Sequence, residues 1–548
     1  MIRLKKMLAL AIAMIMVICT MNMGVFAASG DLTPDQTITI TGLDEGDTVR
    51  LYNILSWTGS TGWTINPDYV GIVTEGTNYY TTHVKDLVDN KPGVELTKGD
   101  LENITKCVKD AGKKPAQEKT LKTSPYTFDT KDAPGMYLAL IAPGKSGVIY
   151  NPIIVSADFS AAPNTSEIDA SHKNMGTSAV AKKETITVEK EISNTDYTHN
   201  VGDTVSFTIT GQIPAYSNSY VDPKFIVTDT LTKGLTLDGN PIVTCDVKSY
   251  ITEKTAHSFK VEFDSHDIAA LTTYAGYTIT YNATITNQAL HNVNEDENDV
   301  VVEYSNDPKE DNDKGKIKDK TKHYTFTIDG ELLGKTGFRE LELIKVGLNA
   351  DGTPAFDPIQ VSNGTKVAAL DGAEFGLYTT YDGADKETEA LLYKNKEFTG
   401  KITTENGGLL VIRGLDAGEY YLKELKAPKG YVRDTKVHTI NIDADIRNED
   451  TTETLKDGTV VTYKTPVLHG YTITIDGVDT AKYSATISGS EILESVTGEV
   501  ETSELANTKG VELPATGGMG TTIFYVIGTI LVLGAGILLV TRRRMGAN

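Results

Sequence analysis

Short stretches of alternating polarity dominate this sequence. They are rich in Thr, Val, Ile and Tyr and are separated by Gly, Asp, Asn and Pro, as in residues 36–41, 48–52 and 135–141. Because successive side chains of a strand point to opposite faces, this pattern predicts antiparallel sheets with one buried face. Helical periodicity is scarce, and only residues 80–111 could carry a helix or two. We therefore predict an all-β protein.

The two ends of the chain carry different signals. Three basic side chains, an apolar stretch over 7–21 and a small residue at Ala27 predict a cleaved secretory signal peptide. An uncleaved anchor is the alternative, but the apolar stretch is short for a membrane span. At the other end, residues 523–540 are apolar and long enough to cross a bilayer as a helix, and arginines at 542–544 keep the C-terminus inside.

The segment between these signals is too long for one hydrophobic core. It has about 480 residues, which predicts about three domains. A small, polar stretch over 160–181 is typical of a linker. We predict a signal peptide over 1–27, an N-terminal β domain over 28–178, a middle domain over 179–320, a C-terminal domain over 321–510 and a terminal membrane segment over 511–548.

Charge and cysteine content restrict the function. The net charge of −22 argues against nucleic acid and anionic membrane surfaces as partners. Cys19 leaves with the signal peptide, so only Cys107 and Cys245 remain, in different predicted domains. An exported chain normally uses disulfides as cross-links, so this chain either needs none or has another covalent device.

Polar side chains occupy apolar strand faces in the middle domain. Lys190 shares its face with Ile186, Val188 and Ile192, near the start of the domain. By the same alternation, Asp229 lies on an apolar face of a middle strand and Asn306 on that of the last strand. The alternation therefore predicts a lysine, a carboxyl and an amide in one core.

The C-terminal domain repeats this order. Lys345 follows Leu341 and Leu343 on one face, Glu424 comes in the middle, and Asn507 lies near the end. Burial of an amine and a carboxyl is costly unless the two groups pair or neutralise each other. Desolvation lowers the pKa of the lysine and raises that of the carboxyl, which favours a neutral amine beside a protonated acid.

This chemistry predicts a covalent cross-link. A neutral amine is a nucleophile, and an amide polarised by a protonated acid is an electrophile held close to it. The product would be an intramolecular Lys–Asn isopeptide bond, formed once per domain with loss of ammonia. Ordinary structural roles are the alternative, because strand lysines snorkel and terminal Asp or Asn residues cap turns. Recurrence in two domains of an exported chain with few cysteines favours the bond.

Two groups of motifs carry a family resemblance. Residues 420–431 match the E-box pattern, and residues 370–378 match the strand that follows the lysine in collagen-adhesin B-type domains. Residues 202–209 and 225–231 resemble the middle domain of sortase-assembled pilus backbone subunits of Gram-positive bacteria. The resemblance implies tandem immunoglobulin-like, collagen-adhesin-type β-sandwiches. It also places Lys190, Asp229 and Asn306, and Lys345, Glu424 and Asn507, on the bond-forming positions, with the two carboxyls promoting the reaction.

The end of the chain resembles a cell-wall sorting signal. It consists of Leu513-Pro514-Ala515-Thr516-Gly517, the membrane segment and the arginines. An ordinary tail anchor does not need this pentad. The resemblance implies that a membrane sortase cuts between Thr516 and Gly517 and transfers the threonyl carbonyl to an amine, so that the helix holds the chain only transiently.

A polymerising pilin also needs an acceptor lysine, which the family carries near the end of its first domain, often after Tyr-Pro. This chain has no Tyr-Pro-Lys, but Lys182 and Lys183 have the right location, and Lys173 is an alternative. We prefer Lys182, with Lys183 close behind; a solvated linker pair is the other interpretation. The first domain shows no lysine in its opening strand, so we expect no isopeptide bond there.

Motifs for other functions are weak. The acidic runs 294–299 and 307–319 lack complete EF-hand spacing, and we interpret them as solvated loops. The histidines show no zinc-protease arrangement, and no phosphate loop or nucleophile elbow is present. We expect no metal, no cofactor and no turnover of an external substrate.

Two functional hypotheses remain. The first is a pilus shaft subunit, displayed on the wall of a Gram-positive bacterium, with sortase, neighbouring subunits and peptidoglycan or its lipid-linked precursor as partners. The second is a monomeric wall-anchored adhesin, or a pilus tip or base subunit, that binds a host ligand. A wall-anchored hydrolase finds little support in any motif.

Overall fold

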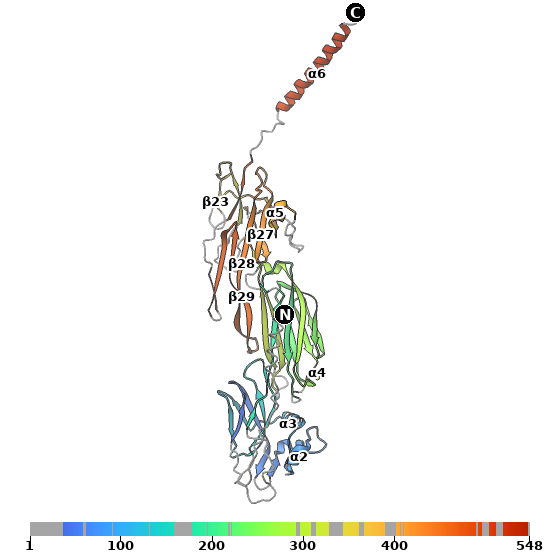
Figure 1. Ribbon diagram of the computed structural model, residues 1–548, viewed down its shortest axis with the longest axis vertical. Coiled ribbons are helices and arrows are strands. Elements are labelled where there is room, and N and C mark those ends of the chain that lie inside the picture. Colours follow the sequence, from blue (N-terminus) through green and yellow to red (C-terminus); the bar gives the residue numbers. More distant parts are fainter. Residues whose placement is uncertain are drawn as a thin grey trace.

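The computed structural model describes most of the chain between the termini. It describes residues 37–157, 178–327, 343–388, 402–495, 503–510 and 519–545, with internal gaps at 59–61, 90, 92, 131, 194, 218–219, 221, 292–295, 308–313, 361–365, 406, 409, 411 and 489–490. Figure 1 shows three β-rich blocks in a row along the long axis, with helix α6 beyond the third. The prediction of an all-β protein of tandem β domains with a C-terminal apolar helix is confirmed. The predicted domain boundaries stay predictions.

The first block combines small sheets with helices. Its largest sheet has the strand order β3-β2-β6-β8, with β4 also paired to β2, and a second sheet has the order β5-β1-β9. The predicted helical region, 80–111, forms α2 and α3. The bounds are β1 Thr37–Thr41, β2 Thr48–Thr58, β3 Gly62–Ile65, η1 Pro67–Val73, α2 Thr82–Val88, α3 Lys98–Ala111, β4 Gln117–Thr120, β5 Tyr126–Asp129, β6 Gly135–Ala142, β7 Val148–Tyr150, β8 Ile153–Ala157, β9 Ser178–Val180 and β10 Lys183–Thr185.

Residues 178–185 belong to the sheets of the first block. Strand β9 runs parallel to β1, and β10 pairs with β7. The chain therefore crosses from the first block to the middle block only after Thr185, and the two predicted acceptor lysines lie at this crossing.

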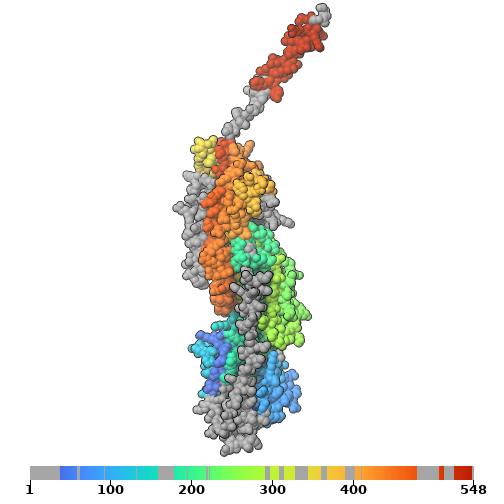
Figure 2. All heavy atoms as spheres, in the orientation of Figure 1, coloured from blue at the N-terminus to red at the C-terminus, as the bar shows by residue number. Residues whose placement is uncertain are grey.

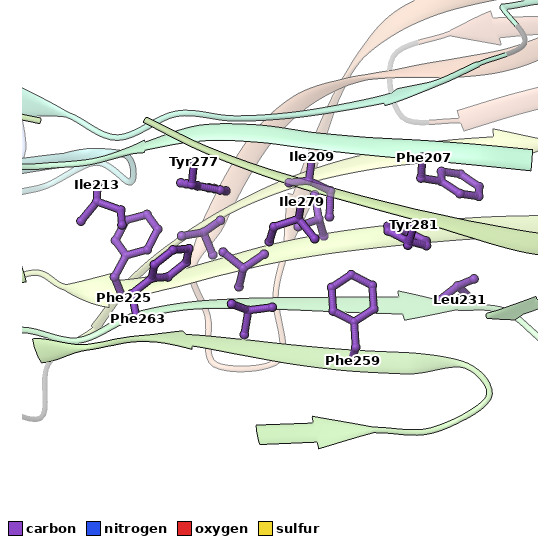
Figure 3. Packing of buried hydrophobic residues seen from close by; sticks show 14 of the residues in the cluster. Phe207, Ile209, Ile213, Phe225, Leu231, Phe259, Phe263, Tyr277, Ile279 and Tyr281 are labelled. Atoms are coloured by element: carbon purple, nitrogen blue, oxygen red, sulfur yellow. The ribbon is translucent and has the colours of Figure 1, made fainter. Parts of the chain in front are cut away.

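The middle block is a β-sandwich. One sheet has the order β11-β12-β17-β14 and the other β15-β16-β13-β18-β19. The aromatic and aliphatic side chains labelled in Figure 3 come from both sheets and fill the space between them. The bounds are β11 Val188–Ile192, β12 Thr204–Ile213, β13 Phe225–Leu231, β14 Leu235–Cys245, β15 Ser249–Lys254, β16 Ser258–Phe263, α4 Ser265–Ala269, β17 Ala275–Ile285, η2 Asn287–His291, β18 Asp296–Ser305 and β19 Lys314–His323.

The acidic runs are not simply solvated loops, and this interpretation is wrong. Much of both runs lies in the antiparallel strands β18 and β19. Lys320 pairs with Glu297 at 2.8 Å and Lys318 with Asp299 at 2.8 Å. Cross-strand pairs of opposite charge stabilise a sheet, so the lysines of β19 let these acidic residues form a strand.

The third block is built on a seven-stranded sheet in the order β25-β24-β27-β28-β29-β30-β31. Strand β21 pairs in parallel with β32 outside this sheet. The bounds are β20 Phe326–Thr327, β21 Leu343–Leu348, β22 Ile359–Gln360, β23 Lys366–Val367, β24 Glu374–Tyr378, α5 Tyr381–Lys386, β25 Ile402–Thr403, β26 Arg413–Leu415, β27 Gly418–Lys426, β28 Val437–Thr454, β29 Val460–Ile475, β30 Val478–Ser488, β31 Glu491–Ser495 and β32 Ser503–Thr508.

The hairpin of β28 and β29 reaches beyond its own block. It extends alongside the middle block, as the orange and green regions of Figure 2 show. Lys318 of β19 contacts Glu453 of the hairpin at 2.8 Å, and Lys316 contacts Asp457 at 2.5 Å. The hydroxyl of Ser146, in the first block, donates to the carbonyl of Val460 at 3.1 Å. The hairpin therefore contacts all three blocks.

Loss of Lys318 is expected to loosen the hairpin. Only 5% of the Lys318 side chain is exposed, and it neutralises Asp299 and Glu453 together. Lys318→Ala leaves both carboxylates without this partner; because these are 26% and 35% exposed, the loss should cost about 1 to 2 kcal/mol, less than for a fully buried pair. Hydrogen exchange should therefore accelerate across Val461–Val467. Lys320→Ala is the control, because the ion pairs that Lys320 makes among the described residues join β19 to β18 and do not reach the hairpin. Equal acceleration in both variants would contradict the expectation.

Helix α6, Met519–Met545, is apolar along most of its length. Its segment Phe524–Met545 is long and apolar enough to cross a membrane, with a mean hydropathy of 2.3. The signal peptide over 1–27, Lys173 and the pentad over 513–517 lie outside the described residues.

Candidate functional site

The middle block holds a lysine, a carboxyl and an amide in contact. Nζ of Lys190, on β11, contacts Oδ2 of Asp229, on β13, and donates to Oδ1 of Asn298, on β18, at 2.6 Å. The side chains of Lys190 and Asp229 are fully buried, and Asn298 is 0% exposed. The amine therefore lies against the carbonyl group that it would attack.

The amide in this site is Asn298, and the prediction of Asn306 is wrong. Asn298 and Asn306 both have even numbers, like the residues of β18 that point into the core of the sandwich, but they lie near opposite ends of that strand. Asp229 pairs with Val300, two residues from Asn298, whereas Tyr304, next to Asn306 on the same face, pairs with Phe225. At about 3.4 Å per residue, Asn306 lies roughly 20 Å along the strand from Val300. The carbonyl oxygen of Asn306 lies 3.4 Å from the hydroxyl of Tyr220, close to the first block.

Burial sets the protonation of the middle site. Removal from water lowers the pKa of Lys190 and raises that of Asp229, although each group partly opposes the shift of the other. Both shifts favour transfer of a proton from the amine to the acid. Nζ also lies 5.5 Å from the ring centre of Phe207 and 5.6 Å from that of Tyr281.

The third block brings together Lys345 on β21, Glu424 on β27 and Asn507 on β32. Nζ of Lys345 lies 3.3 Å from Oε1 of Glu424, and Nδ2 of Asn507 donates to Oε2 of Glu424 at 2.7 Å. All three residues are at most 1% exposed. Burial lowers the pKa of Lys345. The parallel pairing of β21 with β32 sets Lys345 and Asn507 on neighbouring strands.

Both sites have the arrangement needed for amide exchange. In the middle site the buried amine contacts both the carboxyl and the carboxamide, whereas in the third block the carboxyl contacts both the amine and the carboxamide. In each site the strands that carry the lysine and the amide are far apart in the chain. The sequence missed Asn298 because it lies within an acidic run, but its parity with Val300 and Val302 is a signal that could have found it.

The two predicted acceptor lysines differ in exposure. The Lys182 side chain is 62% exposed and lies 3.2 Å from Glu184, whereas that of Lys183 is 34% exposed and lies 2.6 Å from Asp44. Lys182 is therefore the more accessible amine of the pair.

Comparisons with known proteins agree with this architecture. The model of a prealbumin-like fold domain matches residues 361–459, and that of the LPXTG cell wall anchor motif matches residues 506–545. The trypsin-resistant surface T6 protein of Streptococcus pyogenes serotype M6 is 25% identical over 472 residues, covering 76% of this chain and 80% of the relative.

A solved structure of a backbone pilin shows a similar fold. The T6 backbone pilin of Streptococcus pyogenes has a TM-score of 0.55 and 19% identity, covering 88% of this chain and 100% of the pilin. The major pilin SpaD of Corynebacterium diphtheriae has a TM-score of 0.45 and 18% identity, covering 75% and 92%.

The class follows from these findings. This is a cell-wall-anchored surface protein of a Gram-positive bacterium, with a sorting motif that implies processing by sortase. The predicted resemblance to sortase-assembled backbone pilins is confirmed.

Proposed function

We propose that this chain is the shaft subunit of a pilus, in which sortase joins Thr516 of one subunit to Lys182 of the next. Each subunit would be stiffened by two internal isopeptide bonds, Lys190–Asn298 and Lys345–Asn507. The observation that carries this proposal is the fully buried contact of Lys190 with both Asp229 and Asn298. A buried charged pair adds little stability by itself, so a reaction that consumes the amine accounts better for its presence.

The proposed roles fall on different blocks of the subunit. Lys182 accepts the acyl group at the crossing between the first and middle blocks, with Lys183 as the second choice. Asp229 and Glu424 would promote the internal bonds by taking a proton from the amine and polarising the amide. The last subunit would be transferred to peptidoglycan or its lipid-linked precursor. The relative's name records resistance to trypsin, and internal cross-links would give this chain the same property.

Mass spectrometry of the intact mature protein tests the internal bonds. Each bond releases one ammonia, so the mass should be below that of the sequence by about 17 Da per bond, or about 34 Da in all. Peptide mapping should find Lys190 joined to Asn298 and Lys345 joined to Asn507. An Asn306→Ala variant should keep the full deficit. An unshifted mass of the wild-type protein would refute the isopeptide bonds.

A further inference from the structure

A tyrosine hydroxyl lies between the acid and the amide of the middle site. The hydroxyl of Tyr281, on β17, donates to Oδ1 of Asp229 at 3.0 Å and accepts from Nδ2 of Asn298 at 2.7 Å. Tyr281 is 5% exposed, and its two partners are 0% exposed. The nitrogen that Tyr281 contacts is the atom that must leave as ammonia if Lys190 attacks the amide.

The third block makes the corresponding link without a tyrosine. There Oε2 of Glu424 accepts directly from Nδ2 of Asn507 at 2.7 Å, while Oε1 lies 3.3 Å from Nζ of Lys345. Glutamate is one methylene longer than aspartate. In both sites the carboxyl is thus linked to the amine on one side and to the amide nitrogen on the other. In the middle block Asp229 is too short to contact the amide nitrogen directly, and the Tyr281 hydroxyl bridges the two groups.

We propose that Tyr281 is a catalytic residue for the Lys190–Asn298 bond, because it relays a proton to the leaving amide nitrogen. This inference rests on the proposed isopeptide bond in the middle block. Lys190 Nζ first transfers a proton to Oδ2 of Asp229. The lone pair of the neutral amine then attacks Cγ of Asn298, and the electrons of the C=O bond move to Oδ1.

The collapse of this intermediate requires one more proton transfer. For this transfer the acid proton moves from Oδ2 to Oδ1 of Asp229, and the Tyr281 hydroxyl turns from Oδ1 toward Nδ2, reversing the two hydrogen bonds of the resting site. Nζ then gives its second proton to Oδ2 while Oδ1 passes its proton to the Tyr281 oxygen. The hydroxyl proton of Tyr281 moves to Nδ2, the electrons on Oδ1 restore the C=O bond, and the C–N bond breaks with its electron pair on nitrogen. The products are the isopeptide bond, ammonia and a protonated Asp229, so atoms and charge balance.

The ring of Tyr281 is held in place independently of its hydroxyl. It stacks on Phe207 with a centroid distance of 5.1 Å and an interplanar angle of 13°, and Phe259 meets it edge-on at 4.9 Å. Figure 3 shows these three rings together at one end of the core. Tyr281→Phe should therefore keep the packing and remove only the proton relay.

The test follows ammonia loss by intact mass in freshly synthesised mature chain. Wild type should reach the deficit of two bonds, whereas Tyr281→Phe should retain the third-block bond and form the middle bond about a hundredfold more slowly. Tyr277→Phe is the matched control: Tyr277 lies on the same strand and face of β17, and its buried hydroxyl has no hydrogen-bond partner among the described residues. Its bond should form at the wild-type rate.

The outcomes separate the two proposals. A wild-type chain without the middle-block deficit would refute the isopeptide bond itself, whereas a normal rate in Tyr281→Phe would overturn the relay alone. A structural role is tested in the Lys190→Ala background, where no middle bond can form. There Tyr281→Phe should lower the melting temperature only slightly. A drop as large as that caused by Lys190→Ala itself would show that Tyr281 acts on folding, and would also overturn the relay.

Discussion

Replacing Lys182 with alanine is expected to abolish the high-molecular-weight ladder that wall extracts give on an immunoblot. A sortase-bound threonine needs an amine that is accessible and able to lose its proton to the solvent or to the enzyme. The Lys182 side chain is 62% exposed, and its partner Glu184 lies only two residues away, at 3.2 Å. The variant should still be exported and attached to the wall as a single band, because Thr516 is unchanged.

Lys183→Ala is the control for this experiment. Lys183 is adjacent in sequence and has the same charge, but it is half as exposed and is held by Asp44. Its ladder should persist. A ladder lost in Lys183→Ala and kept in Lys182→Ala would move the acceptor to Lys183, and a ladder kept in the double variant would point to Lys173 or another lysine. A single band from the wild type would instead favour the monomeric adhesin.

Loss of the middle cross-link is the second change with a large expected effect. Lys190 and Asn298 are 108 positions apart, and closing a loop of about 100 residues stabilises a protein by about 4–5 kcal/mol in the chain-entropy treatment of cross-links. Lys190→Ala should lose this contribution. For a domain of this size the melting temperature should fall by about 10–20 °C, which calorimetry of the mature protein can measure.

A double variant separates the cross-link from the buried charge. Lys190→Ala alone leaves the carboxyl of Asp229 in the core without its amine, which destabilises the fold for a reason unrelated to the bond. Lys190→Ala with Asp229→Ala removes both groups and the bond. The double variant should therefore remain well below the wild type in melting temperature. Recovery to the wild-type value would mean that the bond contributes little.

The sequence predicted which face each functional side chain occupies, but not the register between strands. Period-two alternation placed Lys190 and Asp229 on core faces, and both are buried. The same alternation allows Asn298 and Asn306 equally, since they differ by an even number of positions. Only the pairing of β13 with β18 decides between them, and it joins residues about 70 positions apart whose alignment no local pattern records.

The length of the hairpin of β28 and β29, and the residues that it contacts, also cannot be predicted from the sequence. The residues of β28 and β29 alternate like those of any strand, and nothing in this pattern indicates that the outer half of the hairpin packs on another block. The lysines of β19 gave a signal, because an alternating row of positive charges beside acidic strands favours ion pairs. The acidic residues between these lysines favour a solvated loop when read alone, and the partner of Lys318, Glu453, lies more than a hundred positions away.

The reach of this hairpin has a consequence for how a fibre of such subunits would bend. A chain of domains joined only by short connections hinges at every connection, and its persistence length is then shorter than one subunit. Here one element touches the first block at Ser146, the middle block at Lys316 and Lys318, and belongs to the third. The hairpin restrains both connections between blocks within the subunit. Bending of the fibre should therefore concentrate where one subunit meets the next.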